Sequence, residues 1–277
     1  MSLDWATLPP QIQQFKDQIL ATAKPSVSIE LQGTAAVTRW QSQIGGMPYL
    51  PLTESYPMDR EGKPLKLLAQ MNFAEMPSLP DYPSSGILQF YIGGDDLYGA
   101  DFDDLQKQAD FRVMFFEQVI EDESLLHQDF SEYFAQFDAD YYSPVEGQSA
   151  LSFAVETQYI STDDENFARQ VLSMDDIWDY EEQFEGTDLQ EDWLDPYNEQ
   201  FPSTGHRLGG YPYFTQSDPR EYRDELKAYV LLLQIDSDQA NGIDIMWGDV
   251  GVGNFFIDPA DLKKRDFSKV AYNWDCG

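Results

Sequence analysis

The heptapeptide IGGMPYL at residues 44–50 returns as LGGYPYF at residues 208–214. A glutamine follows both copies at one fixed distance, because Gln70 and Gln234 each lie 25 positions after the first glycine of their copy. Both glutamines end apolar runs, LLAQ and LLLQ, and a third block, FYI against FFI, follows further along the chain. Three matched blocks at a nearly constant offset indicate an internal duplication.

Each block has a physical interpretation. Gly-Gly permits a positive φ or a close backbone approach, and the X-Pro step that follows holds the chain extended. We therefore expect a turn that leads into a short edge strand. The apolar runs at 65–70 and 229–235 are typical of central, buried strands. Segments 86–92 and 253–257 are predicted to be their partners, each after a glycine-containing turn.

The remaining pattern predicts an α+β fold. Alternating or clustered apolar residues predict further strands at 27–31, 111–117, 151–155 and 270–274, and helices are predicted at 9–23 and 259–264. We expect two pseudo-symmetric repeats of mainly antiparallel strands that share one core. The repeats occupy about residues 26–117 and 200–277 of a single domain spanning 1–277, and a connector at 118–199 joins them.

The connector is strongly acidic. Residues 117–199 hold 24 Asp and Glu residues against one basic residue, Arg169, while the whole chain has a formal net charge of −33. The aromatic residues in this stretch include Phe134, Tyr141, Tyr142, Phe167, Trp178, Tyr180, Phe184 and Trp193. They are too numerous for a disordered acidic tail. We expect a partly helical insertion with aromatic side chains inward and carboxylates outward.

Composition narrows the class of protein. The chain has 277 residues, of which 42% are hydrophobic and 14% aromatic, which is typical of a folded globule despite the charge. No apolar run approaches the roughly 20 residues that span a bilayer, and no secretory signal opens the chain. The single cysteine, Cys276, excludes an internal disulfide, so a reducing, cytoplasmic location is expected. The negative charge disfavours nucleic acid and membrane surfaces and leaves a cationic partner open. Solubility, or an organism whose proteins are generally acidic, is the favoured explanation of the charge itself.

Motifs for cofactor or nucleophile chemistry are missing from the sequence. It has no P-loop, no H-E-x-x-H and no G-x-S-x-G, and its two histidines, His127 and His206, offer few general bases. The glycine-rich stretch at 248–253 lies between two predicted strands, so we interpret it as a turn. No cofactor is expected.

Gln70 and Gln234 are the first candidate site residues, because an amide within an apolar strand must find hydrogen-bond partners. They either face a common cleft on a two-fold axis or bind backbone groups and fasten each strand to its glycine turn. The second interpretation is favoured, since amides are common fasteners and poor acid–base catalysts.

Carboxylates in loops form a second group of candidates. The loop after the first repeat's strand holds Asp95, Asp96, Asp101, Asp103 and Asp104. The corresponding neighbourhood after Gln234 holds Asp236, Asp238, Asn241 and Asp244. Oxygen ligands of this kind are able to bind calcium or magnesium. The run DSDQANG that begins at Asp236 departs from the EF-hand, however, with alanine at a ligand position and no closing Glu. Solvated turns are therefore favoured, and no metal is expected.

Tyr91, Trp247, Asp249 and Asn254 form the third group of candidates. An aromatic wall with an acid and an amide is able to hold a sugar or a cationic ligand. Aromatic residues beside β-turns more often pack in the core or at its rim, so this group is weighed against simple packing.

The matched blocks resemble the YwqG-like family of bacterial proteins, which carry a domain of unknown function. The blocks that carry the resemblance lie at 45–49, 68–70, 86–90, 232–236, 247–249 and 254–257. The similarity covers roughly residues 31–274. It implies a mixed α/β fold with an internal repeat in a soluble, intracellular bacterial protein, and it transfers no catalytic residue.

Two functional hypotheses follow. The preferred one is a non-catalytic, soluble binding protein, a monomer whose acidic middle segment presents the surface for a basic protein partner. The concentration of negative charge in that stretch and the scarcity of His and Cys favour it. The alternative is a carboxylate-dependent hydrolase, with or without a metal, that acts in a cleft between the two repeats. Asp249, Asp236 and Asp95 would then supply the acid, the base or the metal ligands.

Overall fold

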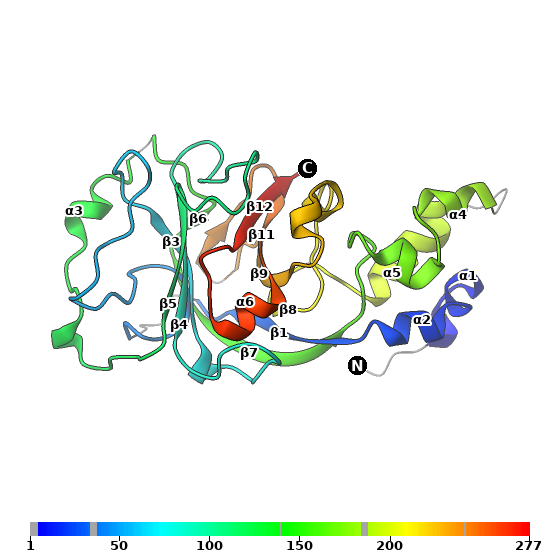
Figure 1. The fold of residues 1–277 in the computed structure, drawn as a ribbon, viewed down its shortest axis with the longest axis horizontal. Coiled ribbons are helices and arrows are strands. Elements are labelled where there is room, and N and C mark those ends of the chain that lie inside the picture. Colours follow the sequence, from blue (N-terminus) through cyan, green and yellow to red (C-terminus); the bar gives the residue numbers. More distant parts are fainter. Residues whose placement is uncertain (1–4, 34–37, 139, 184–187, 241) are drawn as a thin grey trace.

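The computed structural model in Figure 1 describes residues 5–33, 38–138, 140–183, 188–240 and 242–277. The strands are β1 (Lys24–Leu31), β2 (Gln43–Gly45), β3 (Lys66–Asn72), β4 (Ile87–Ile92), β5 (Phe111–Phe116), β6 (Val145–Glu146), β7 (Gln148–Gln158), β8 (His206–Gly209), β9 (Val230–Asp236), β10 (Asp244–Ile245), β11 (Gly251–Ile257) and β12 (Ala271–Cys276). The α-helices are α1 (Pro10–Gln13), α2 (Lys16–Ala21), α3 (Ser131–Phe134), α4 (Trp178–Gln183), α5 (Asp195–Gln200) and α6 (Pro259–Lys264). Short 3₁₀ or π turns are η1 (Trp5–Thr7), η2 (Phe73–Glu75), η3 (Glu123–Leu125), η4 (Ala168–Leu172), η5 (Gln190–Leu194), η6 (Pro219–Tyr222) and η7 (Asp224–Leu226).

Within the described residues, ten strands form one antiparallel sheet in the order β12-β11-β9-β8-β1-β7-β2-β3-β4-β5. A first strand group (β2, β3, β4 and β5) and a second strand group (β8, β9, β11 and β12) flank the central pair β1 and β7. Strand β1 pairs with β8 of the second group, whereas β7 pairs with β2 of the first. The chain therefore crosses from one group to the other in the middle of the sheet.

The sheet curls so that the two strand groups face each other across a common core (Figure 1). Phe90 on β4 contacts Phe255 on β11, with ring centroids 4.7 Å apart. Phe111 on β5 contacts Tyr272 on β12 at 5.2 Å. All four rings are buried, and aromatic side chains remove large apolar areas from water, so these contacts hold the curl together.

The curl also brings the two end strands, β5 and β12, close together. The Tyr272 N–H on β12 donates to the Leu105 carbonyl at 2.9 Å. The Gln108 amide donates to the Phe267 carbonyl at 2.7 Å and accepts from the Val113 N–H of β5 at 2.8 Å. Since an uncovered sheet edge pairs readily with other chains, this bridge protects part of both edges.

The structure confirms the α+β class, the mainly antiparallel strands and the helix at 259–264. It corrects the prediction of an edge strand after the glycine turn. Gly45 and Gly209 do have positive φ, at 64° and 68°, but they end β2 and β8, which lie inside the sheet with partners on both sides. The helix predicted at 9–23 is divided into α1 and α2, because Phe15, at φ −98° and ψ 14°, leaves helical geometry.

Helices α1, α2, α4 and α5 gather at one end of the molecule around a core of their own (Figure 1). Phe167, Tyr180 and Trp193 are buried there, as predicted for the aromatic residues of the connector. Tyr142 and Trp178 are exposed instead, and Phe184 lies outside the described residues. The connector also contributes β7 to the main sheet. Among the helices in the described ranges, none has both the length and the hydropathy of a transmembrane span.

The glycine turn yields a stability prediction. A Cβ added at Gly45 would lie 2.4 Å from the Gly147 carbonyl oxygen, in addition to requiring φ of 64°. We expect Gly45→Ala to destabilise the fold by about 2–5 kcal/mol, from strain plus steric overlap. The matched control is Gly62→Ala, where φ is 82° but nothing lies within 4 Å, so about 1 kcal/mol is expected. Equal losses in chemical denaturation would contradict the steric explanation.

Candidate functional site

Gln70 is fully buried on β3 and binds three backbone groups of the glycine-turn segment. Its Oε1 accepts from the Tyr49 N–H at 2.8 Å. Its Nε2 donates to the carbonyls of Arg39 and Gln41 at 2.9 and 2.7 Å. The amide therefore satisfies backbone groups where the chain leaves the sheet.

Gln234 on β9 makes the same set of contacts. Its Oε1 accepts from the Tyr213 N–H at 2.8 Å, and its Nε2 donates to the carbonyls of Ser203 and Gly205 at 2.9 and 2.7 Å. The partner strand adds one more amide in each group, since Gln89 and Asn254 donate to the Tyr49 and Tyr213 carbonyls. These four amides fasten both glycine turns to their strands.

The two glutamines do not meet in a common cleft. Gln70 is paired across the strands with Gln89, and Gln234 with Asn254. Phe90 follows Gln89 on β4, and Phe255 follows Asn254 on β11. Both rings face the core between the two strand groups. Because successive side chains on a strand point to opposite faces, the amides point away from that core and from each other.

The third group of candidates is also dispersed. Tyr91 is buried and donates to Gln89 Oε1 at 3.1 Å, so it belongs with the first strand group. Trp247 is buried against Tyr98 and Trp274. Asp249 lies exposed in the turn before β11. These side chains therefore pack or face solvent, and they do not enclose a ligand together.

The loop carboxylates are mostly engaged by their own loops. Asp95 accepts from the Gly99 N–H at 2.6 Å, and Asp236 accepts from the Gly205 and Ser237 N–H groups. Asp96 is exposed. Among the described residues, which do not include Asn241, no three His, Cys, Asp or Glu side chains lie close enough together to hold a metal ion.

Asp238 faces a buried histidine. Its Oδ2 lies 3.4 Å from His206 Nε2, while His206 Nδ1 accepts from the Asp236 N–H at 3.0 Å. The second contact places the proton of the neutral ring on Nε2, toward Asp238. Burial lowers the pKa of His206. The negative charges of Asp238 and Asp236 raise this pKa, but burial has the larger effect. The histidine is therefore a structural link between β8 and the end of β9.

A surface cleft of about 1170 Å³ opens beside the first strand group, and sequence reasoning missed it as a site. Three separate segments line it: the hairpin tip at 59–63, the loop at 93–110 and the stretch at 135–142. Asp95, Asp101 and Asp103, all from the group of loop carboxylates, are among its lining residues. Only the third segment, 135–142, belongs to the acidic connector. The other two segments precede the connector, so most of the cleft lining lies outside it.

The cleft is anionic. Its acidic lining residues are Asp59, Glu61, Asp95, Asp101, Asp103, Asp110, Asp138 and Asp140, and its basic ones are Arg60, Lys63 and Lys107. Each basic side chain is already paired within the cleft: Arg60 with Asp110, Lys63 with Glu61 and Lys107 with Asp101. The uncompensated charge is therefore negative, and clefts with low-dielectric walls concentrate such a potential.

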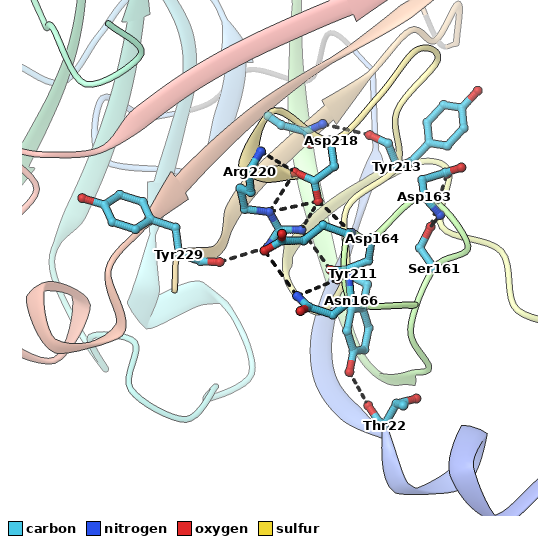
Figure 2. Close-up of polar contacts among 12 residues, drawn as sticks. Thr22, Ser161, Asp163, Asp164, Asn166, Tyr211, Tyr213, Asp218, Arg220 and Tyr229 are labelled. Atoms are coloured by element: carbon cyan, nitrogen blue, oxygen red, sulfur yellow. Dashed lines mark hydrogen bonds and ion pairs between the residues drawn. The ribbon is translucent and has the colours of Figure 1, made fainter. Parts of the chain in front are cut away.

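A second feature missed at the level of sequence is a buried ionic cluster around Arg220 (Figure 2). The Arg220 guanidinium donates from Nε to Asp218 at 2.9 Å and from Nη2 to Asp164 at 2.9 Å. Its Nη1 donates to the Tyr229 carbonyl at 2.9 Å. The cluster ties the segment after β7 to the loop that leads into β9. Loss of one partner would leave a buried charge uncompensated.

The cluster shifts the pKa of its members. Burial alone would lower the pKa of Arg220, but the carboxylates of Asp164 and Asp218 outweigh it and raise the pKa, so the guanidinium stays charged. Nearby, burial raises the pKa of Asp163 to about 6, and the charges of Asp275 and Asp218 add to the effect. Asp163 accepts from the Ser161 hydroxyl, as Figure 2 shows.

Fold and site together define an α+β protein with a curled antiparallel sheet and an anionic cleft formed by loops at one side of it. The chain belongs to the family of the domain of unknown function DUF1963, whose model matches residues 42–276. The match includes both strand groups, the cleft and the Arg220 cluster, whereas β1 precedes it. A search of curated proteins gave no match.

The amide contacts yield a prediction that separates a structural from a binding role. Gln234→Leu would leave one N–H and two carbonyls without partners, so we expect a loss of about 2–5 kcal/mol in the free energy of unfolding. Gln70→Leu should cost a similar amount. The control is the exposed Gln239→Leu, expected to change stability by less than about 0.5 kcal/mol. A Gln234 variant as stable as the control would refute the fastening role.

Asp163 yields a pH prediction. Its pKa is about 6 in the folded chain and about 3.9 when unfolded, so the folded state binds the extra proton and stability falls as the pH rises between these values. Asp163→Asn cannot ionise, and we expect it to exceed the wild type by about 1–3 kcal/mol above pH ~6 and to match it below pH ~4. Thermal unfolding across this range, with Asp175→Asn as the exposed control, measures the difference. A constant difference at all pH values would contradict the assignment.

Proposed function

We propose that this chain is a non-catalytic binding protein whose anionic cleft holds a Lys- or Arg-rich segment of a basic protein partner. One observation carries the proposal: eight acidic and three basic side chains line the cleft, and the three basic ones are already paired. In the described part of the chain, Asp59, Asp95, Asp103, Asp138 and Asp140 form no ion pair with a basic side chain. Cations on a partner would fill that deficit and accelerate association.

The walls of the cleft suit long cationic side chains. Tyr142 is 56% exposed, and Phe102 and Leu97 are each 40% exposed, which is unusual for large apolar residues. Lys and Arg carry apolar stems that pack on such surfaces, and their charged ends bind aromatic faces as well as carboxylates. A flat acidic surface without these apolar residues would attract cations but would not select a peptide segment.

The hydrolase alternative has less support. It needs Asp249, Asp236 and Asp95 to work in one cleft, whereas Asp236 is held by backbone N–H groups beside β8 and Asp95 by the N–H of Gly99. Asp249 is exposed and is not part of the cleft lining. A carboxylate pair for acid–base work must flank one reacting group.

We also propose that the two strand groups are copies of one ancestral unit, as in the YwqG-like family that the sequence resembles. The support lies in the matched amide contacts and in one shared irregularity. An extra residue interrupts the pairing at Leu68 on β3 and at Leu232 on β9, the same place in both copies. A chain that supplies both halves of such packing needs no second copy, so we propose a monomer.

Binding to acetyl-hexalysine amide tests the proposed function. We expect affinity to fall by at least about tenfold between about 50 and 200 mM salt, because binding releases counterions. The double variant Asp138→Asn, Asp140→Asn should bind about three- to tenfold more weakly. Asp175→Asn, Asp176→Asn removes the same charge outside the cleft and should change affinity by less than about twofold. Calorimetry that detects no binding at low salt, or equal losses in both variants, would exclude the cleft.

A further inference from the structure

Arg60 spans the anionic cleft from one wall to another. It sits at the tip of the hairpin at 59–63, which is closed by a hydrogen bond from the Asp59 N–H to the Lys63 carbonyl at 2.8 Å. Asp110 lies on the opposite wall, in the loop before β5. It accepts from the Arg60 main-chain N–H at 3.1 Å and is ion-paired with the Arg60 guanidinium. The hairpin is thus held to the loop through both the backbone and the side chain of Arg60.

Arg60 also lies 3.8 Å from a second carboxylate, Asp101. Asp101 and Asp110 are 17% and 14% exposed at their side chains, whereas Arg60 is 50% exposed. Asp101 is held in place by its own loop, since it accepts from the Asp103 N–H at 3.2 Å and contacts Lys107 at 2.6 Å. Two sheltered carboxylates therefore meet a half-exposed guanidinium.

We propose that Asp101 and Asp110 form a guanidinium subsite, which Arg60 fills in the free protein and which an arginine of the partner takes by displacing Arg60. This inference rests on the proposed function and specifies its ligand. A planar guanidinium presents several N–H donors in a fork and bridges two carboxylates, whereas an ammonium acts as a point charge. Half-exposed ion pairs are weak in water, so Arg60 is readily displaced. The subsite thus favours Arg over Lys. Arg60 competes with the partner's arginine for the two carboxylates and so weakens binding of the partner.

The test compares two variants that lose the same charge. Arg60→Gln removes the guanidinium from the subsite and leaves Lys107 on Asp101. Lys63→Gln removes a lysine that pairs with Glu61 at the rim, where both side chains are 67% exposed. We expect Arg60→Gln to bind acetyl-hexaarginine amide about fivefold or more tightly than wild type, and Lys63→Gln to gain less than about twofold. The increase in affinity caused by Arg60→Gln should be smaller for acetyl-hexalysine amide than for acetyl-hexaarginine amide. The double variant Arg60→Gln, Asp110→Asn should show no such increase for either peptide.

A second measurement does not depend on any peptide. About 20 mM guanidinium chloride should raise the thermal midpoint of Arg60→Gln relative to sodium chloride at equal ionic strength, and should not do so for Lys63→Gln. Equal peptide affinities in the two single variants, with wild-type binding intact, would overturn the subsite and leave the proposed function standing. A guanidinium-specific rise without any peptide binding would support the subsite and remove the proposed function. Absence of both effects would overturn both proposals.

Discussion

The fold depends on buried side-chain amides at the two places where the chain turns out of the sheet. A Gly-Gly turn ends each of the short strands β2 and β8, and the backbone groups on either side of it have no strand opposite them. Gln70 and Gln234 bind those groups directly, with the same three contacts in each case. A buried backbone group without a partner is costly, so the amides decide whether these short strands form at all. Strands β2 and β8 in turn connect the outer strands of each group to the central pair.

The curled sheet then acts as a rigid support for loops. Its core is filled from both strand groups, with Phe90 against Phe255 at the centre. Loops on such a support carry recognition because they place side chains without the packing constraints of the core. The cleft follows this rule, since the hairpin before β3, the loop before β5 and the stretch after α3 line it. In the second half of the chain, the buried charges of the Arg220 cluster join the helical end to the sheet.

Sequence reasoning predicted local structure well and spatial neighbours less well. Apolar runs and alternation located nearly all the main strands, and the equal spacing of Gln70 and Gln234 pointed to their fastening role. The sequence predicted an edge strand after each glycine turn, whereas β2 and β8 precede the turns and lie inside the sheet. A positive φ describes local backbone geometry and does not indicate which strand pairs with the segment. The cleft was missed because its carboxylates come from three segments that are far apart in sequence and individually read as solvated turns. Arg220 was missed because it stands in the run DPREYRDE, whose charge suggests a surface, and burial of a charged residue has no local signature.

The crossing of β1 and β7 has a consequence for biosynthesis. Strand β1 is translated well before its partners, because it pairs with residues 148–158 and 206–209. Until then its alternating apolar residues have no place in a sheet, and the first strand group lacks the neighbour that β7 provides. Contacts this distant along the chain slow folding, because a long loop must close before they form. The centre of the main sheet therefore stays incomplete until residues 206–209 have been translated, and an edge of β1 stays exposed until then.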